Sequence, residues 1–155
     1  MNRRVAMGFV VLLVTGILTT VQGSSSQPPQ ATRKVIKLAG GPVQAPFSDA
    51  ILTGNTLYLA GRIGIDPKTG KVPDKIDDEI KLLLDGEKEV LAQAGMTMDD
   101  LVYVQVSCTD LGLFGQFNAI YKTYFTKDYP AREFVGAGSL LIGGHFELQA
   151  IAVKH

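Results

Sequence analysis

Two charged residues near the C-terminal end of the chain have the types and the settings for anion binding and water chemistry. Arg132 follows the turn Tyr129-Pro130-Ala131, and Glu147 lies within the mostly apolar run 144–153. A charge beside low-dielectric packing needs a partner, either in the chain or in a bound ligand. We therefore expect a small pocket in which Arg132 binds an anion beside the Glu147 carboxylate. On these residues alone, an interface salt bridge between the two explains the pattern equally well.

Other reactive side chains are few. The sequence has two histidines and one cysteine, and no group of Cys, His and Asp has the spacing of metal ligands. It therefore predicts no metal site. Cys108 follows Val102, Val104 and Val106 at intervals of two residues, which places all four on one face of a predicted strand. This pattern favours a buried structural thiol over a nucleophile.

The overall composition indicates one globular domain. The chain has 155 residues, of which 46% are hydrophobic and 19% charged, enough to enclose a sizeable core. The 15 basic and 15 acidic residues cancel, and no run of Lys or Arg is long enough to follow a phosphate backbone. We therefore expect no nucleic acid partner.

The N-terminal segment differs in composition from the rest. Residues 1–23 combine a positively charged start, an apolar run at 5–18 and small residues up to Gly23, which is the pattern of a secretory signal peptide. The apolar run is shorter than the ~20 residues of a membrane-spanning helix, although an uncleaved membrane anchor is the alternative. Residues 24–32, rich in Ser, Gln and Pro, predict a disordered spacer. The expected mature protein is one domain over residues 33–155, periplasmic or secreted, and free of the membrane once the signal is removed.

The first part of this domain predicts strands. Short β-type runs cover residues 35–38, 50–53 and 56–63. The second and third runs flank Gly54-Asn55, a pair typical of two-residue hairpin turns because both residues tolerate positive φ. Residues Asp66 to Gly70 then form a loop with strong turn chemistry.

A long amphipathic helix follows. From Asp77 the period of the apolar residues changes from two to 3.6, with Asp77 or Asp78 as the expected N-cap and Gly95 as the stop. The apolar stripe of this helix comprises Ile80, Leu83, Leu84, Val90, Leu91 and Ala94.

A second helix is predicted over residues 113–125, with a mostly aromatic stripe made of Phe114, Phe117, Asn118, Tyr121 and Phe125. Asn118 lies in the middle of this stripe, where an amide without hydrogen-bond partners costs roughly 1 to 3 kcal/mol. Either it bonds a nearby backbone group and locks the packing, or it faces a pocket.

Strands are also predicted over residues 101–109, 133–137 and 145–153. The order of strands and helices is then an α+β pattern with both helices on one face of a mainly antiparallel sheet. In the last strand, His145, Glu147 and Gln149 share one side with two apolar residues. We expect this polar side to meet another subunit or to form a cleft.

These residues together resemble a known family, the RidA/YjgF proteins, which are reactive-intermediate imine deaminases. The resemblance covers roughly residues 34–153 and rests on several short motifs in a shared order and spacing. The motifs are Ala45-Pro46-Phe47-Ser48-Asp49-Ala50, Gly61-Arg62-Ile63 with Asp66-Pro67-Lys68-Thr69-Gly70, Phe117-Asn118-Ala119-Ile120-Tyr121, Pro130-Ala131-Arg132, and Glu147 with Ala150-Ile151-Ala152-Val153.

The resemblance implies a fold, an assembly and a reaction. It implies a chorismate-mutase-like domain that forms a homotrimer with a ligand cleft at each subunit interface. It implies hydrolysis of 2-imino acids to 2-keto acids and ammonia, without a cofactor. By resemblance, Arg132 binds the substrate carboxylate and Glu147 holds the attacking water. Asn118, Phe47 and Gly61 then contribute to the substrate site.

The chain departs from the family pattern at several positions near this site. Many members have Tyr at the position of Phe47, and many have Ser-Gly-Gln-Ile-Pro where this chain has Ala60-Gly61-Arg62-Ile63-Gly64. Two hydroxyl groups are therefore absent, and a charge is added at Arg62. The usual Arg-Leu-Pro is Ser139-Leu140-Leu141, and a second acid after Glu147 is replaced by Gln149.

Two further interpretations follow. The first is a non-catalytic module that binds small carboxylates in the same clefts. The second is RNA cleavage, assigned to some members of the family, which the neutral charge and the lack of a basic stripe do not favour.

Overall fold

The computed structural model describes residues 32–38 and 46–155. The predicted signal peptide and nearly all of the predicted spacer lie outside the described residues. The described part forms a mixed sheet with the strand order β1-β2-β3-β6-β4-β5. All neighbouring strands are antiparallel except β4 and β5, which are parallel. The strands are β1 (Arg33–Ile36), β2 (Ala50–Thr53), β3 (Thr56–Ile63), β4 (Leu101–Cys108), β5 (Ala131–Gly136) and β6 (Phe146–Val153).

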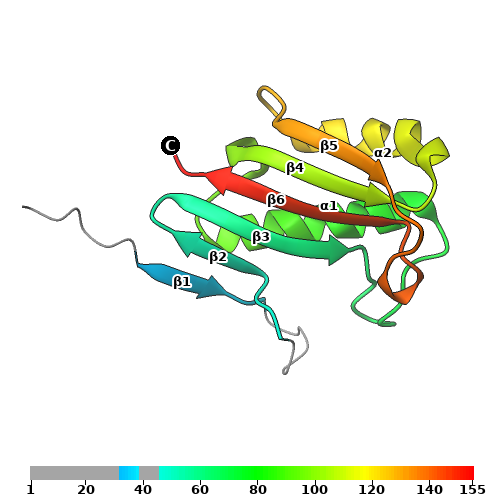
Figure 1. Cartoon of the computed structure of the whole chain (residues 1–155), viewed down its shortest axis with the longest axis horizontal. Helices are drawn as coiled ribbons and strands as arrows, with labels where there is room; N and C mark the ends of the chain where they lie inside the picture. The colour runs from blue at the N-terminus through cyan, green and yellow to red at the C-terminus, as the bar shows by residue number, and fades with distance from the viewer. Residues whose placement is uncertain (1–31, 39–45) are drawn as a thin grey trace, which may run out of the picture. The chain divides into compact units, whose positions relative to one another are not determined.

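Two α-helices, α1 (Ile76–Gln93) and α2 (Phe114–Tyr121), cover one face of this sheet, as Figure 1 shows. This arrangement confirms the predicted α+β class. The core lies between the helices and the sheet. The predicted stripe of α1 supplies much of it, because its five large aliphatic residues are fully buried. Two glutamates of the same helix, Glu79 and Glu87, are also buried, which the apolar pattern did not predict.

The turns that connect these elements follow the sequence closely. The β2–β3 hairpin turns at Gly54, which has a φ of 59°, whereas Asn55 keeps a negative φ. A glycine in the first central position is typical of a type II′ turn. Gly95 has a φ of 69°, and the Met96 amide donates to the Leu91 carbonyl at 2.9 Å. This left-handed glycine ends α1, as predicted.

Some boundaries differ from the predictions. Helix α1 begins at Ile76 with Lys75 as N-cap, and no side chain caps it. Asp77 and Asp78 lie inside the first turn instead, where the helix dipole favours acidic residues. Helix α2 spans Phe114–Tyr121 and is flanked by 3-10 turns at 111–113 and 122–124, so it is shorter than expected. Strand β1 lies two residues earlier than expected.

The valine face of β4 is interrupted at its start. Val104, Val106 and Cys108 are fully buried, but Val102 is 40% exposed and Leu101 takes the inward position. The reason is a register shift of β4 against β6 between Leu101 and Tyr103. Cys108 is therefore buried, and burial raises the pKa of its thiol. A buried thiol with a raised pKa is a poor nucleophile.

Neither α1 nor any other helix of the described residues is long and apolar enough to cross a membrane.

Candidate functional site

Arg132 lies on β5 and extends toward α2. Its Nη2 donates to Asn118 Oδ1 at 2.7 Å. The guanidinium carbon lies 4.7 Å from the centroid of the Tyr121 ring, a distance at which a cation is attracted to the face of the ring. Three further rings surround it at 5.7 to 6.0 Å, those of Phe114, Phe117 and Phe134.

The geometry decides between the two roles considered for Asn118. Its amide oxygen accepts a hydrogen bond from a guanidinium rather than from a backbone group. Asn118 and Tyr121 are three residues apart on α2, so they lie on the same face of the helix. The aromatic stripe of α2 thus encloses Arg132, and Asn118 orients it.

No carboxylate of the described residues lies within 4 Å of the Arg132 guanidinium. Arg132 and Glu147 therefore form no salt bridge within one chain, and the interface salt bridge that the sequence left open stays a prediction. The hydroxyl of Tyr121 beside Arg132 is buried without a hydrogen-bond partner among the described residues. Burial raises the pKa of the Tyr121 hydroxyl to about 12. Smaller effects come from Arg132, which lowers this pKa, and from Tyr129, which raises it. Among the described residues, Arg132 is therefore surrounded mainly by aromatic rings and has no carboxylate partner.

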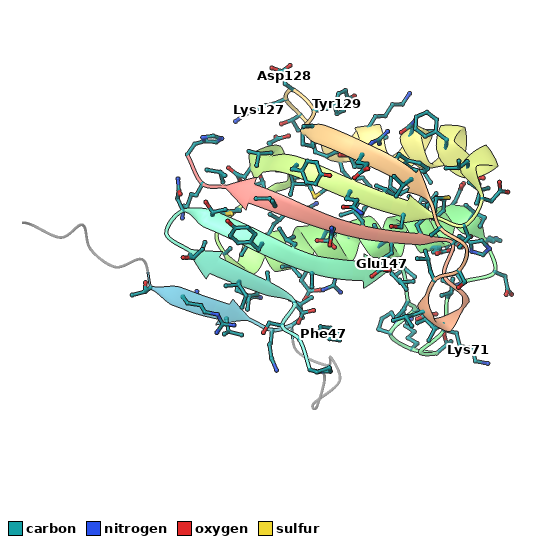
Figure 2. The ribbon with its side chains drawn as sticks, in the orientation of Figure 1. Phe47, Lys71, Lys127, Asp128, Tyr129 and Glu147 are labelled. Carbon is teal, nitrogen blue, oxygen red and sulfur yellow. The ribbon has the colours of Figure 1, made fainter. Side chains whose placement is uncertain are left out.

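Glu147 lies on the other face of the sheet. Phe146 and Leu148, its neighbours in β6, are buried beneath the helices, and side chains alternate along a strand. The Glu147 side chain therefore points away from the helices, as the sequence predicted. In the sheet it pairs with Ile63 of β3, and Figure 2 shows it near the end of that strand.

Gly61 and Glu147 lie close together. A Cβ atom added to Gly61 would overlap the Glu147 carboxylate, so a larger residue would displace this carboxylate from its present position. The approach coincides with a β-bulge, because Leu59 pairs with Ala150 whereas Arg62 pairs with Leu148. A bulge inserts one extra residue and re-aims the side chains that follow it.

Arg132 and Glu147 are not brought together within one chain. Strand β4 separates β5 from β6, a lateral distance of about 10 Å. Along β4, Arg132 is level with Val104 and Glu147 with Ser107, a further offset of about 10 Å at the usual rise per residue. The two side chains also point to opposite faces. The predicted site thus consists of two separate halves in the chain.

Phe47 shares a cavity with Gly61 but not with Glu147 or Arg132. It is 58% exposed, precedes β2, and lines a cavity of about 760 Å³ together with Gly61. Figure 2 labels both Phe47 and Glu147. The cavity is also lined by Leu38, Asp49, Ala60, Arg62, Ile63 and Leu82, among others.

The charge that Arg62 adds beside the expected cleft does not enter the Glu147 face. Its Nη2 donates to Asp49 Oδ1 at 2.7 Å, and its Nε lies 3.7 Å from Glu87 Oε1. Sequence reasoning missed both partners. An acidic residue inside the apolar stripe of α1, at the position of Glu87, was the available signal.

Glu79 was missed for the same reason. Its fully buried carboxylate accepts the backbone N–H groups of His145 at 2.7 Å and Phe146 at 3.1 Å. The His145 Nδ1 lies 2.7 Å from its other oxygen. His145 therefore binds α1 and does not continue the polar row of Glu147 and Gln149. Glu79 fixes the start of β6, directly before Glu147.

Possible metal ligands are not grouped in the part of the chain that the structure covers, where no three His, Cys, Asp or Glu side chains come together. The two halves offer a cation on one side and a carboxylate on the other.

The sequence of this chain is similar to a protein family and to several named proteins. The family model described as Endoribonuclease L-PSP matches residues 41–154. The 2-iminobutanoate/2-iminopropanoate deaminase of Bos taurus is 36% identical over 124 residues, covering 79% of this chain and 90% of that protein. A RutC family protein of Pyrococcus horikoshii is 39% identical over 110 residues, covering 70% of this chain and 87% of that protein.

Solved structures show the same fold. The structure of the YjgF gene product of E. coli superposes with a TM-score of 0.73 at 32% identity, covering 79% of this chain and 99% of that chain. The structure of E. coli TdcF with bound serine gives a TM-score of 0.74 at 29% identity, with the same coverage of 79% and 99%.

Proposed function

Because this chain belongs to the RidA/YjgF family, we propose that it hydrolyses reactive 2-imino acids to 2-keto acids and ammonia. Relatives at 35 to 38% identity that carry the name 2-iminobutanoate/2-iminopropanoate deaminase support the reaction. The structural observation that carries the proposal is the state of Arg132. Its guanidinium is oriented by Asn118 and surrounded by aromatic rings, and it has no carboxylate partner among the described residues.

Arg132 binds the carboxylate of the substrate in this mechanism. One donor of Nη2 is used by Asn118, which leaves the other donors of the guanidinium for the ligand. A planar guanidinium meets a carboxylate with two parallel hydrogen bonds, which an ammonium group cannot do. The apolar surroundings strengthen the attraction, because few competing dipoles or counterions are present.

Glu147 acts on the water that attacks the C=N carbon. The carboxylate accepts a proton from this water as the C–O bond forms and passes it to the imine nitrogen, which gives the carbinolamine. Glu147 then takes the hydroxyl proton as the C=O bond forms and delivers it to the leaving nitrogen, which departs as ammonia. An imine carbon is already electrophilic, so positioning and proton transfer supply most of the catalysis. No cofactor takes part.

The separation of the two halves supports a site shared between chains. In one chain, Arg132 and Glu147 face opposite sides of the sheet, whereas a second copy can bring its Glu147 face to the Arg132 edge. Strand β5 is an edge strand, so a neighbour can approach it without breaking the sheet. We therefore propose a homotrimer with its clefts between subunits, in keeping with the closed symmetry of most homo-oligomers.

The reaction is tested by ammonia release from iminopyruvate and iminobutyrate generated in situ. Arg132→Ala and Glu147→Gln are each expected to lose about 100-fold or more in kcat/KM. Arg33→Ala, which removes an exposed arginine of β1, serves as the matched control and should retain full activity. An Arg132→Ala variant as fast as the parent excludes this mechanism.

A binding module without catalysis is the second candidate, favoured by the absence of hydroxyl groups at Phe47 and Ala60. Calorimetry with 2-keto acids separates the two functions. Binding in the absence of any imine turnover supports the module, and measurable turnover excludes it.

We further propose that residues 1–23 direct export of the protein to the periplasm or the medium. The proposal rests on the charged start and apolar run of this segment. N-terminal sequencing of the protein from cell fractions tests it. A mature chain that begins near Ser24 outside the cytoplasm is expected, and an intact Met1 in the cytoplasm contradicts it.

A further inference from the structure

The side chain of Arg62 joins three separate segments of the fold. Arg62 lies at the bulge of β3, donates to Asp49 at 2.7 Å and lies 3.7 Å from Glu87 of α1. Asp49 in turn accepts the Leu38 amide at 2.9 Å through its other carboxylate oxygen. Its backbone carbonyl accepts the Ala60 amide at 2.9 Å. One guanidinium thus connects β3, the segment before β2 and the central part of α1.

Gly86 makes this path possible. A Cβ atom at Gly86 would lie 2.7 Å from Arg62 Cδ and 3.2 Å from both Nε and Nη1. A real Cβ does not approach a neighbouring atom so closely, so any larger residue would push the guanidinium aside. Gly86 is an interior position of α1, where glycine weakens a helix relative to alanine by up to about 1 kcal/mol. The close approach of Arg62 gives this unfavourable glycine a structural reason.

The segments that Arg62 connects carry the proposed substrate residues. Phe47 is two residues before Asp49, and Gly61 directly precedes Arg62 in the bulge. At the bulge, Gly61 and Arg62 face opposite sides of the sheet. Gly61 lies beside the Glu147 carboxylate, and the Arg62 side chain extends to Asp49. Holding Arg62 on one face therefore holds Gly61 on the other.

Glu87 supplies a second, weaker partner. Its side chain is 1% exposed, and neither of its carboxylate oxygens has a hydrogen-bond partner among the residues described. Burial raises the pKa of Glu87 to about 8, while Arg62 lowers it and Asp49 raises it. Glu87 is thus mainly neutral at pH 7, and Asp49 is the ionised partner of Arg62 among the described residues. Above pH 8, an ionised Glu87 attracts the guanidinium through Nε, a different nitrogen from the one that binds Asp49, and so draws Arg62 toward α1.

We propose that Arg62 is a positioning residue that holds the Phe47 and Gly61 wall of the cleft in place. Its side chain passes Gly86 and lies between Asp49 and Glu87. This inference rests on the proposed deaminase function and deepens it. Arg62 lines the same cavity as Phe47 and Gly61, but its guanidinium is bound to Asp49 and turned toward α1, so this scheme gives it no contact with the reacting atoms. It acts through the bulge on one side and through Asp49 on the other.

Two substitutions displace Arg62 in different ways. Arg62→Gln removes the charge, and Gly86→Ala keeps the charge but fills its path. Both are expected to lower kcat/KM for imine hydrolysis between about tenfold and a hundredfold, mainly through KM, because the misplaced wall binds substrate poorly. Gly86→Ala is the sharper variant, since alanine favours the helix and the unfolding temperature should not fall. A role in stability alone would predict the opposite result, with unchanged kinetics in the folded variant.

The pH profile provides the third measurement. In the parent, kcat/KM is expected to fall as the pH rises through about 8, and Glu87→Gln is expected to lack this fall. Parent and variant are compared on the same substrate, so that the pH dependence of the imine itself cancels. Identical profiles in parent and Glu87→Gln overturn the role of Glu87.

The outcomes for the positioning role and for the reaction are separable. If Arg62→Gln and Gly86→Ala match the parent while Arg132→Ala loses activity, the positioning role is wrong and the deaminase stands. If Arg132→Ala retains full activity, the deaminase mechanism itself fails. Circular dichroism of each variant verifies folding, and loss of folding in Arg62→Gln leaves Gly86→Ala to decide.

Discussion

Arg132 and Glu147 lie on opposite faces of the sheet and two strands apart, although the sequence predicts that they share a site. Arg132 is oriented by Asn118 under the helices, and Glu147 packs beside Gly61 on the open face. The proposed reaction needs both the guanidinium and the carboxylate at one substrate. This relationship makes the assembly of two chains a chemical requirement of the proposed reaction.

Mixed subunits test this requirement directly. Arg132→Ala and Glu147→Gln are each expected to be inactive, but co-refolding them in equal amounts places an intact arginine beside an intact glutamate in about one quarter of the interfaces of a symmetric ring. Ammonia release by the mixture should therefore recover to about one quarter of the parent rate. A mixture as inactive as its components contradicts a site shared between chains.

Asn118→Ala tests the orientation of Arg132. A hydrogen bond to a charged group contributes about 1.5 to 3 kcal/mol, so we expect KM for the imine to rise about tenfold or more. The matched control is Gln116→Ala, which removes an exposed amide of the same helix that bonds Asp77. Equal kinetics for the two variants would show that Asn118 serves packing only.

Gly61→Ala tests the space that Glu147 occupies. The added Cβ overlaps the Glu147 carboxylate, and because the side chain is flexible we expect it to move and kcat to fall about tenfold or more. The φ of Gly61 is not positive, so alanine introduces no backbone strain there. Gly115→Ala, whose Cβ would meet nothing within 4 Å, is the control and should keep parental activity. A normal kcat in Gly61→Ala argues against Glu147 as the group that acts on water.

Glu87 should make the free energy of unfolding depend on pH. Burial raises the pKa of Glu87 from an ordinary value of 4.5 to about 8 in the folded chain. The folded state therefore holds a proton that the unfolded state releases, and stability falls as the pH rises from about 4.5 to about 8. Glu87→Gln should remove this decline, with a difference on the order of a few kcal/mol between the two ends of the range.

Urea unfolding at several pH values from 5 to 9 measures this slope. Glu89→Gln, an exposed glutamate of the same helix, is the control and should keep the parental decline. If Glu87→Gln and the parent decline in parallel, Glu87 is ionised in the folded chain across this range.

The sequence predicted the elements whose signal is local. The β2–β3 hairpin, the stripe and glycine stop of α1, and the alternation that turns Glu147 away from the helices all follow from periods and turn residues within a few positions. The predicted N-cap of α1 was wrong. Aspartate is a common N-cap residue, but here both aspartates lie in the first turn of the helix, after the N-cap residue Lys75.

The contacts that shape the candidate site could not be predicted in the same way. Glu79 and Glu87 occupy apolar positions of α1, and periodicity assigns charged residues to the surface. Their partners, His145 and Arg62, are distant in sequence. The bulge before Arg62 shifts the register by one residue, which no pattern of a single strand reveals. Register and buried ion pairing are properties of the packed sheet.

Strand β6 has a consequence for how the chain folds. Although it is the most C-terminal of the described strands, it lies between β3 and β4 in the middle of the sheet. The hairpin of β2 with β3 and the βαβ unit of β4, α2 and β5 are local and can form early, but they have no common edge until β6 is inserted between them. Such long-range pairing slows folding. Shortening the chain by residues 146–153 would therefore leave two unconnected fragments of sheet rather than a smaller domain.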